Sequence, residues 1–324
     1  GVARSAFGTS TSAGQVLPRL PHLESSQTSI PDIYVIASVQ HYWMRLQGTT
    51  LFRDLVSQIE TKDGGRISAA QVATLPFDTL IDLLPVGSGP ALLSPQGSKG
   101  AEELSSMAEV SKQELREFVA EDRPGLTRGP QLGLRPGARV AVALPVYSPE
   151  AFVALVHTMS YACAVPVNPD YSSAELQEEM QGCELVMVLE GDSGDNAMSA
   201  AGFLGLPVVV LRRASRGGGL FSVADWRAVP GHAPAAGSAR PSARADEVLI
   251  LHTSGSTGLK KKVPFTLERW VVGMLCVARS RKLEARSAKG AFECLNMLPL
   301  FHNAGIFRSL TALLLGGSVL MAGP

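Results

Sequence analysis

The sequence predicts an α/β protein with mostly parallel sheets flanked by helices. Short, uninterrupted apolar stretches alternate along the chain with stretches whose apolar residues recur at helical spacing. Strands that are apolar on both faces are typical of parallel sheets, because helices cover both faces of such a sheet. The 45% content of hydrophobic residues is ample for a buried core in a chain of 324 residues.

The regular alternation begins near residue 139. Residues 140–144 form a continuous apolar strand, and Ser148-Pro149 then opens a helix. A short strand follows at residues 164–167. The buried stripe of the helix is carried by residues at helical spacing, namely Phe152, Val156, Met159 and Cys163.

A capping box predicts the next helix, since Ser172 is followed three residues later by Glu175. Leu176, Met180 and Cys183 give this helix a buried stripe. The helix is therefore expected to cover a sheet face.

Further elements follow as far as the end of the chain. Residues 212–245, rich in Gly, Ala, Pro and Arg, are predicted to form a surface connection, with residues 217–219 in a flexible linker. Elsewhere the pattern predicts strands at 185–189, 208–211, 292–298 and 318–321, and helices at 267–281 and 304–315.

The part of the chain before residue 77 is less regular. Residues 1–30 are rich in Ser, Thr, Gly and Pro, which predicts a disordered leader, a linker or the remnant of a targeting peptide. Residues 31–76 form an unassigned extension, in which 33–58 could hold a helix or two. The chain starts at Gly1 and stops after an apolar stretch, which is typical of a piece of a longer protein.

Composition excludes several classes of function. Lys plus Arg and Asp plus Glu both number 29, so there is no overall basic field to attract nucleic acid. Prolines, glycines and polar residues interrupt every apolar run before it reaches the length that a membrane span needs. The 4 cysteines lack the spacing of a zinc site or a disulfide framework and are expected to be buried thiols.

The most informative segment is LILHTSGSTGLKKKV at residues 249–263, an apolar strand followed by a loop of small and hydroxylated residues. Gly255 and Gly258 allow positive φ and close approach of a ligand. Lysines at 260–262 bring positive charge. Hydroxyls and exposed amides that can surround phosphate oxygens come from Thr253, Ser254, Ser256 and Thr257. A plain surface turn is the alternative, and neither the P-loop spacing nor a dinucleotide fingerprint is present.

This segment resembles the phosphate-loop signature TSG[ST]TGxPKGV of the adenylate-forming enzymes, the superfamily of acyl-CoA synthetases and AMP ligases. Lys261 falls on the lysine of the signature, whereas Lys260 replaces its proline and Lys262 its second glycine. These two departures predict a loop exit that is less rigid and more cationic than usual.

A second segment, LPLFHNAGI at residues 298–306, resembles the PLFHxxG element of the same family. The resemblance implies that His302, Asn303 and Gly305 line the wall between the acid pocket and the nucleotide. A simple helix entry, with Asn303 or His302 near the N-terminus, is the alternative for this segment alone.

Weaker likenesses at residues 90–93, 137–145 and 165–171 extend the resemblance over 77–324. The resemblance therefore implies that 77–324 is a partial AMP-binding domain, the large N-terminal domain of the fold without its C-terminal part. The ends of the strands, where open α/β sheets bind ligands, are the expected site.

The resemblance implies an acid–thiol ligase. The parent reaction couples a carboxylic acid to ATP, gives an acyl-adenylate and pyrophosphate, and passes the acyl group to CoA or a phosphopantetheine thiol. Thr253 and Lys261 are the implied catalytic residues, and Thr253, Ser254, Gly255, Ser256, Thr257, Gly258 and Lys261 are the implied nucleotide-binding residues. Lys261 would supply the main counter-charge for the departing diphosphate.

The implied cofactors are ATP, Mg²⁺ and CoA or phosphopantetheine, and the Mg²⁺ ligands are expected outside this chain. Expected partners are a small carboxylic acid, ATP and the thiol of CoA or of a carrier protein, with neither nucleic acid nor a transmembrane segment involved. The expected location is cytoplasmic or peroxisomal. Because the later family elements are absent, the chain alone is predicted to be inactive.

Two other functions remain open at this stage. A degenerate relative could keep the fold as a scaffold without catalysis, and the replacements at Lys260 and Lys262 favour that hypothesis slightly. An adenylation module that loads a carrier protein would differ only in the thiol acceptor. The retained TSGSTG and Lys261 favour an enzyme.

Overall fold

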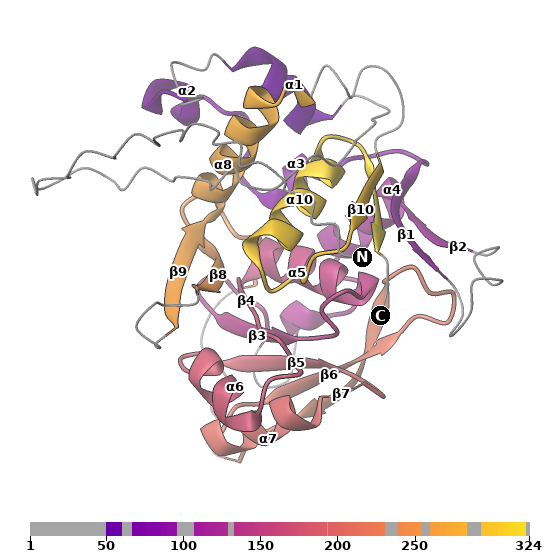
Figure 1. Cartoon of the computed structure of the whole chain (residues 1–324), viewed down its shortest axis with the longest axis vertical. Helices are drawn as coiled ribbons and strands as arrows, with labels where there is room; N and C mark the ends of the chain where they lie inside the picture. Colours follow the sequence, from indigo (N-terminus) through magenta and orange to yellow (C-terminus); the bar gives the residue numbers. More distant parts are fainter. Residues whose placement is uncertain are drawn as a thin grey trace, which may run out of the picture. The chain divides into compact units, whose positions relative to one another are not determined.

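The structure, a computed structural model, describes residues 50–59, 67–95, 107–128, 133–192, 194–230, 239–253, 260–283 and 293–321. All of them belong to one compact unit, Ser38–Pro324. Within these ranges the chain is a mixed α/β fold with two sheets (Figure 1). No helix of the described ranges is long and apolar enough to cross a membrane.

The larger sheet has seven strands in the order β7-β6-β5-β3-β4-β8-β9. Its inner strands pair in parallel, and each of the edge strands β7 and β9 pairs antiparallel with its neighbour. The parallel strands are β3 (Arg139–Ala143), β4 (Cys163–Pro166), β5 (Leu185–Leu189), β6 (Val208–Arg213) and β8 (Glu247–Thr253). The edge strands are β7 (Phe221–Arg227) and β9 (Lys261–Thr266).

The smaller sheet has four strands in the order β10-β11-β1-β2. Its first three strands run parallel, and the last pair is antiparallel. Its members are β1 (Pro90–Pro95), β2 (Met107–Ser111), β10 (Glu293–Asn296) and β11 (Ser318–Met321). The predicted fold class, α/β with mostly parallel sheets, is confirmed.

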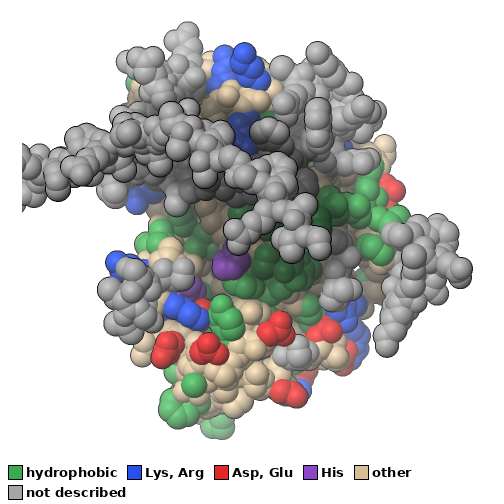
Figure 2. Space-filling view, viewed as in Figure 1, with side chains coloured by type: hydrophobic (Ala, Val, Ile, Leu, Met, Phe, Trp, Pro, Cys, Tyr) green, Lys and Arg blue, Asp and Glu red, His purple; other side chains and the backbone are tan. Residues whose placement is uncertain are grey.

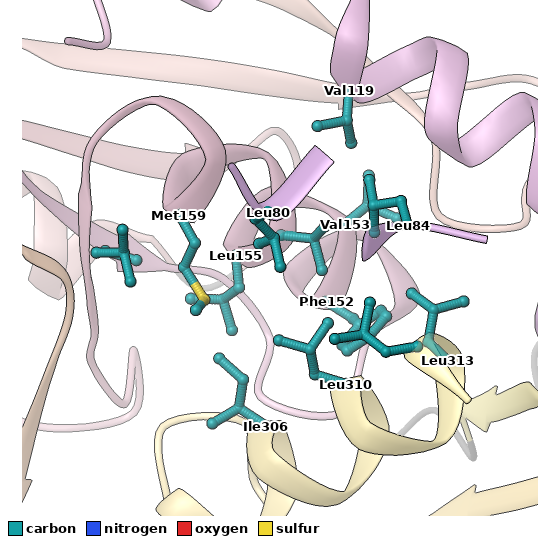
Figure 3. Close-up of a cluster of buried hydrophobic side chains, with 14 of the residues drawn as sticks. Leu80, Leu84, Val119, Phe152, Val153, Leu155, Met159, Ile306, Leu310 and Leu313 are labelled. Carbon is teal, nitrogen blue, oxygen red and sulfur yellow. The ribbon is translucent and has the colours of Figure 1, made fainter. Parts of the chain in front are cut away.

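Helix α5 (Pro149–Tyr161) lies between the two sheets (Figure 1). Every residue from Glu150 to Tyr161 is buried, as expected for a helix that is covered on all sides. Its apolar side chains meet those of α10 (Asn303–Leu314) in the close-up of Figure 3, where Phe152 and Met159 face Ile306 and Leu310. This contact ties the two sheets into one core.

The two faces of the seven-stranded sheet have separate cores. Alternate strand residues such as Leu249 and Leu251 join the core that contains α5 and α8 (Leu267–Ser280). Ile250 joins the core of the other face, which α6 (Ser173–Met180) and α7 (Asp195–Leu204) cover. Successive residues of one strand are therefore buried in two different cores.

The smaller helices pack around this frame. They are α1 (Leu51–Gln58), α2 (Ala69–Ala73), α3 (Leu80–Leu83), α4 (Lys112–Ala120) and the 3₁₀ turn η1 (Leu126–Arg128). The Thr50 hydroxyl donates a hydrogen bond to the Leu314 carbonyl at 2.6 Å, so α1 joins the same core as α10. Arg244 donates to the carbonyls of Val72 and Leu75, which fixes the chain after α2.

The structure differs from the sequence prediction at several points. Cys163 begins β4 and Cys183 follows the end of α6, so neither belongs to the helix in which it was predicted. Residues 212–245 were expected to form a surface connection, but they contain β7, which pairs antiparallel with β6. The glycines at 217–219 have positive φ and make the tight turn between these strands, so the flexible-linker prediction was wrong there. Strand β9 was not predicted at all.

The cysteines are all free thiols. Cys163, Cys183 and Cys294 are buried, but Cys276 is only half-buried, which corrects the expectation that all would be buried. Burial raises the pKa of both Cys163 and Cys183 to about 12. These thiols therefore stay protonated at neutral pH.

A buried carboxylate closes the turn after α4. Asp122 has left-handed backbone, with φ of 45°, and its side chain accepts hydrogen bonds from Leu126 N at 2.9 Å and Thr127 Oγ1 at 2.6 Å. His157 Nε2 lies 3.1 Å from its Oδ1. Burial alone would raise the pKa of Asp122, but His157 and the Thr127 hydrogen bonds outweigh burial and hold it below its usual value.

We predict that Asp122→Asn lowers the free energy of unfolding at neutral pH by about 1–3 kcal/mol, because an amide cannot replace every acceptor of the carboxylate. Asn also tolerates positive φ, so the backbone adds little to the loss. A carboxyl group with a depressed folded pKa contributes stability above its unfolded pKa of 3.8, and that contribution is lost as pH falls through the folded pKa. In urea unfolding the gap between the two proteins should therefore narrow as pH falls below 3.8. A gap of equal size at neutral and at acid pH would contradict the assignment.

Candidate functional site

The two strands that flank the predicted phosphate loop pair directly. β8 and β9 are antiparallel neighbours, with Thr253 opposite Lys261 and His252 opposite Lys262. Both Thr253 and Lys261 are exposed. The structure thus brings together the two predicted catalytic residues, because opposite residues of an antiparallel pair present their side chains on the same face.

The loop between these strands, residues 254–259, lies outside the described residues. Five of the predicted nucleotide-binding residues fall in it, namely Ser254, Gly255, Ser256, Thr257 and Gly258. Their assignment stays a prediction. The residues on either side of the loop define the geometry of the site.

Two of the three consecutive lysines are anchored to the end of α6. Lys260 Nζ lies 2.7 Å from Glu179 Oε1 and 4.1 Å from the centroid of the Tyr171 ring. The Lys262 ammonium donates a hydrogen bond to the backbone carbonyl of Gln181, the residue that caps α6. Both side chains therefore lie on the α6 face of the sheet.

Lys261 points to the opposite face, the one that carries α8. Along the strand it shares this face with Phe265, which packs against Trp270 of α8 at 5.1 Å between ring centroids. Among the described residues the side chain of Lys261 makes neither a hydrogen bond nor an ion pair. Of the three lysines it alone has an ammonium group that no described residue engages, so it is the one best able to meet an anionic ligand.

The anchored lysines change the pKa values around them. Burial raises the pKa of Glu179, and the nearby Lys260 offsets only part of that rise. Burial acts to lower the pKa of Lys260, but the hydrogen bond and charge of Glu179 outweigh it and raise the pKa. Burial and then the charges of Lys262 and Lys260 lower the pKa of His252 to about 4, so this imidazole is neutral at pH 7.

The second predicted motif forms the entry to α10. His302 occupies the N-cap position without a side-chain cap, and Asn303 is the first helical residue. Both are exposed, whereas Gly305 is buried. A Cβ on Gly305 would lie 2.4 Å from the Pro299 carbonyl oxygen, so this turn can close only around a glycine. Residues 298–306 thus form a helix entry, and this geometry is compatible with the predicted role of His302 and Asn303 beside a ligand.

A row of aromatic side chains joins the two motifs. Tyr171 lies under Lys260, and its ring centroid is 6.2 Å from that of Phe301. Phe301 in turn lies 4.3 Å from the His302 ring. These residues follow the carboxyl ends of β4 and β10, and Thr253 ends β8, so the motifs meet at the edge where open α/β sheets hold ligands.

The sequence alone assigned no role to three members of this arrangement: Glu179, Tyr171 and Phe301. Glu179 offered one signal, because a carboxylate beside the buried Leu176 and Met180 needs a positive partner. The two aromatic residues lie in segments that resemble the family, but no local pattern predicted the contact between their rings.

The surface around these elements carries both signs of charge. Figure 2 shows Lys, Arg, Asp and Glu side chains interspersed over the lower part of this face, below a central hydrophobic area. Any anionic ligand is therefore held by local cations, since the whole chain has a formal net charge of +0.

Comparison with known proteins gives consistent results. A family model described as AMP-binding enzyme matches residues 114–324. The acyl-CoA synthetase FUM10 of Gibberella moniliformis is 27% identical over 241 residues, which is 70% of this chain and 41% of that protein.

Solved structures resemble the fold. MatB from Rhodopseudomonas palustris has a TM-score of 0.53 in both its apo form, at 21% identity, and its ATP-bound form, at 22% identity. The match covers 75% of this chain and 44% of MatB. A putative long-chain-fatty-acid CoA ligase from the same species has a TM-score of 0.52 at 22% identity, with 75% of this chain and 57% of that chain covered. The chain thus spans about half the length of these relatives.

We predict that Gly305→Ala lowers the free energy of unfolding by about 1–3 kcal/mol, because its methyl group would be forced against backbone that cannot move aside cheaply. Gly202→Ala in α7 is the matched control. A Cβ there meets nothing within 4 Å, so that variant should gain about 0.5–1 kcal/mol. Urea unfolding measures both. Equal effects of the two substitutions would show that the tight turn before α10 is not formed.

Proposed function

Because the chain belongs to the AMP-binding enzyme family, we propose that the whole protein activates a carboxylic acid with ATP and transfers the acyl group to CoA. The first step gives an acyl-adenylate and pyrophosphate, and in the second the thiol displaces AMP and forms the carbon–sulfur bond of a thioester. The similarity to an acyl-CoA synthetase supports this choice of acceptor over a carrier-protein thiol. The observation that carries the proposal is the Lys261 ammonium group, which no described residue engages and which lies beside Thr253 at the position of the signature lysine.

In this proposal Lys261 supplies the counter-charge for the polyphosphate. Negative charge grows on the departing diphosphate during attack on the α-phosphorus, and a fixed ammonium group lowers the energy of that state. Thr253 and the residues 254–258 add hydroxyl and amide donors. Lys260 and Lys262 contribute less, because their ammonium groups are engaged by α6.

His302, Asn303 and Gly305 are proposed to form the wall beside the acid. Partial burial lowers the pKa of His302, so its ring is neutral at pH 7 and offers packing and hydrogen bonding without a fixed charge. The close turn at Gly305 places these side chains at the start of α10. No side-chain nucleophile is required, because the carboxylate itself attacks.

Magnesium accompanies ATP in the proposed reaction and would neutralise part of its charge. Within the described ranges no group of three or more His, Cys, Asp or Glu side chains is placed to hold a metal ion. We therefore assign no magnesium ligand to these residues and derive no step from the ion.

ATP–pyrophosphate exchange with the whole protein tests the reaction. A panel of carboxylic acids is added one at a time, and exchange that depends on one class of acid is expected. ATP binding without exchange for any acid would overturn the proposal and favour the scaffold alternative.

We predict that Lys261→Met weakens ATP binding by about tenfold to a hundredfold, the loss expected for one charge-assisted contact. Lys262→Met is the control, because it removes the same charge from the next residue of the strand but from its other face. Isothermal titration with ATP and with AMP measures the effect. AMP lacks the β- and γ-phosphates, so its affinity should change by less than about twofold in both variants. Equal losses for the two lysines would contradict the assignment of Lys261.

A further inference from the structure

Lys260 is the residue at which this chain departs most clearly from the phosphate-loop signature, which has a proline there. It lies directly before β9 and next to Lys261. Its side chain is only 29% exposed, and the side chain of its partner Glu179 is 6% exposed. Removing a charge from water in such a position raises the free energy of the folded state unless the charge is paired. This contact therefore differs from the ion pairs of the exposed surface.

The ammonium group of Lys260 has two partners at once. Glu179 Oε1 lies 2.7 Å away, and the Tyr171 ring lies beneath the nitrogen at 4.1 Å from its centroid. A cation over the face of an aromatic ring is attracted by the negative charge of that face. Glu179 lies in α6 and Tyr171 directly precedes the N-cap of that helix, so both contacts hold the lysine against α6 and its entry.

The contact continues from Tyr171 to the second motif. Tyr171 packs against Phe301 in a tilted arrangement, with an angle of 58° between the rings, and Phe301 packs against His302 at 48°. Tilted aromatic pairs at these separations are attractive. A displacement of Lys260 is therefore expected to change the surroundings of the His302 ring, because packed side chains connect the two residues.

We propose that Lys260 is a positioning residue that sets the spacing between Lys261 and the His302 segment. The lysine restricts the start of β9 by a side-chain tether, where a proline would restrict it by its ring. The tether holds Lys261 at one distance from the acid wall. The expected effect on ATP binding rests on the proposed function. The tether itself can be tested without ATP, through the surroundings of His302.

Two other roles for Lys260 make different predictions. If its charge served the nucleotide directly, only ATP binding would respond to its removal. If it served stability alone, the unfolding transition would move without a specific change at His302. A tether predicts a response at His302 in the absence of any ligand.

The test uses the chain with Lys260→Met, Lys260→Arg, Glu179→Gln and the control Lys262→Met. Lys262 lies on the same face and is held by the same helix, but its ammonium group donates to a backbone carbonyl and not to a group that contacts the aromatic row. The first readout is the imidazole resonance of His302 in ligand-free protein, assigned among the 6 histidines by its loss in His302→Gln. The second is the dissociation constant for ATP.

Lys260→Met is expected to shift the His302 resonance and to weaken ATP binding by about tenfold, since misplacement of a charged group by ~1 Å is costly. Lys260→Arg should restore both to within about twofold, because a guanidinium can pair with the carboxylate and stack on the ring. Glu179→Gln should move both readouts in the same direction as Lys260→Met, and it decides the question if Lys260→Met does not fold. Lys262→Met should leave the His302 resonance unchanged.

An unchanged His302 resonance in Lys260→Met and Glu179→Gln would overturn the tether, as would an equal shift in Lys262→Met. Failure of the unmodified chain to bind ATP would instead count against the proposed function. In that case the His302 resonance still decides whether the tether exists.

Discussion

Neighbouring side chains along a strand point to opposite faces of the sheet, and this alternation decides what each lysine at the start of β9 can do. Lys262 faces α6 and is held there, as is Lys260 just before the strand. Lys261 faces the other side of the sheet and lies opposite Thr253 on the paired strand. A shift of the register by one residue would exchange these roles, because it would turn Lys261 toward α6. The pairing of β8 with β9 is therefore the constraint on which the candidate site depends.

The register in turn depends on the core. Leu249 and Leu251 enter the core shared with α5, while Ile250 enters the core beneath α6 and α7. These buried residues fix which face of β8 meets which helix, and the antiparallel partner must follow. Because α5 is buried along nearly its whole length between the sheets, the smaller sheet and α10 are held in the same frame. The start of α10 thus reaches the carboxyl edge where β8 ends.

Much of the frame follows from sequence pattern alone. The parallel strands are continuous apolar stretches, and the capping box at Ser172 marks the start of α6 as observed. The edge strands β7 and β9 were harder to predict from the sequence, for a physical reason. β9 begins with lysines and contains Pro264, features that argue against an inner strand but are tolerated at an edge. β7 includes Asp225 and is partly exposed, so it lacks the apolar signal of the buried strands.

The sequence proposed residues for the candidate site but gave no account of its electrostatics. The two motifs pointed to Lys261, Thr253 and His302, yet three consecutive lysines look equivalent in sequence. The distinction between them comes from Glu179 and from a backbone carbonyl at the end of α6, some eighty residues earlier in the chain. No local pattern announces such a long-range pairing. The role of Tyr171 and Phe301 was not predicted for the same reason, because it depends on a contact between separate segments.

The different roles of the three lysines are tested by their chemical reactivity, measured by reductive methylation and mass spectrometry of each site with and without ATP. Lys261 is expected to react fastest of the three and to become protected by ATP. Lys260 and Lys262 are expected to react slowly in both conditions, because α6 engages their ammonium groups. Equal reactivity of all three lysines, or a Lys261 whose rate does not respond to saturating ATP, would contradict these roles.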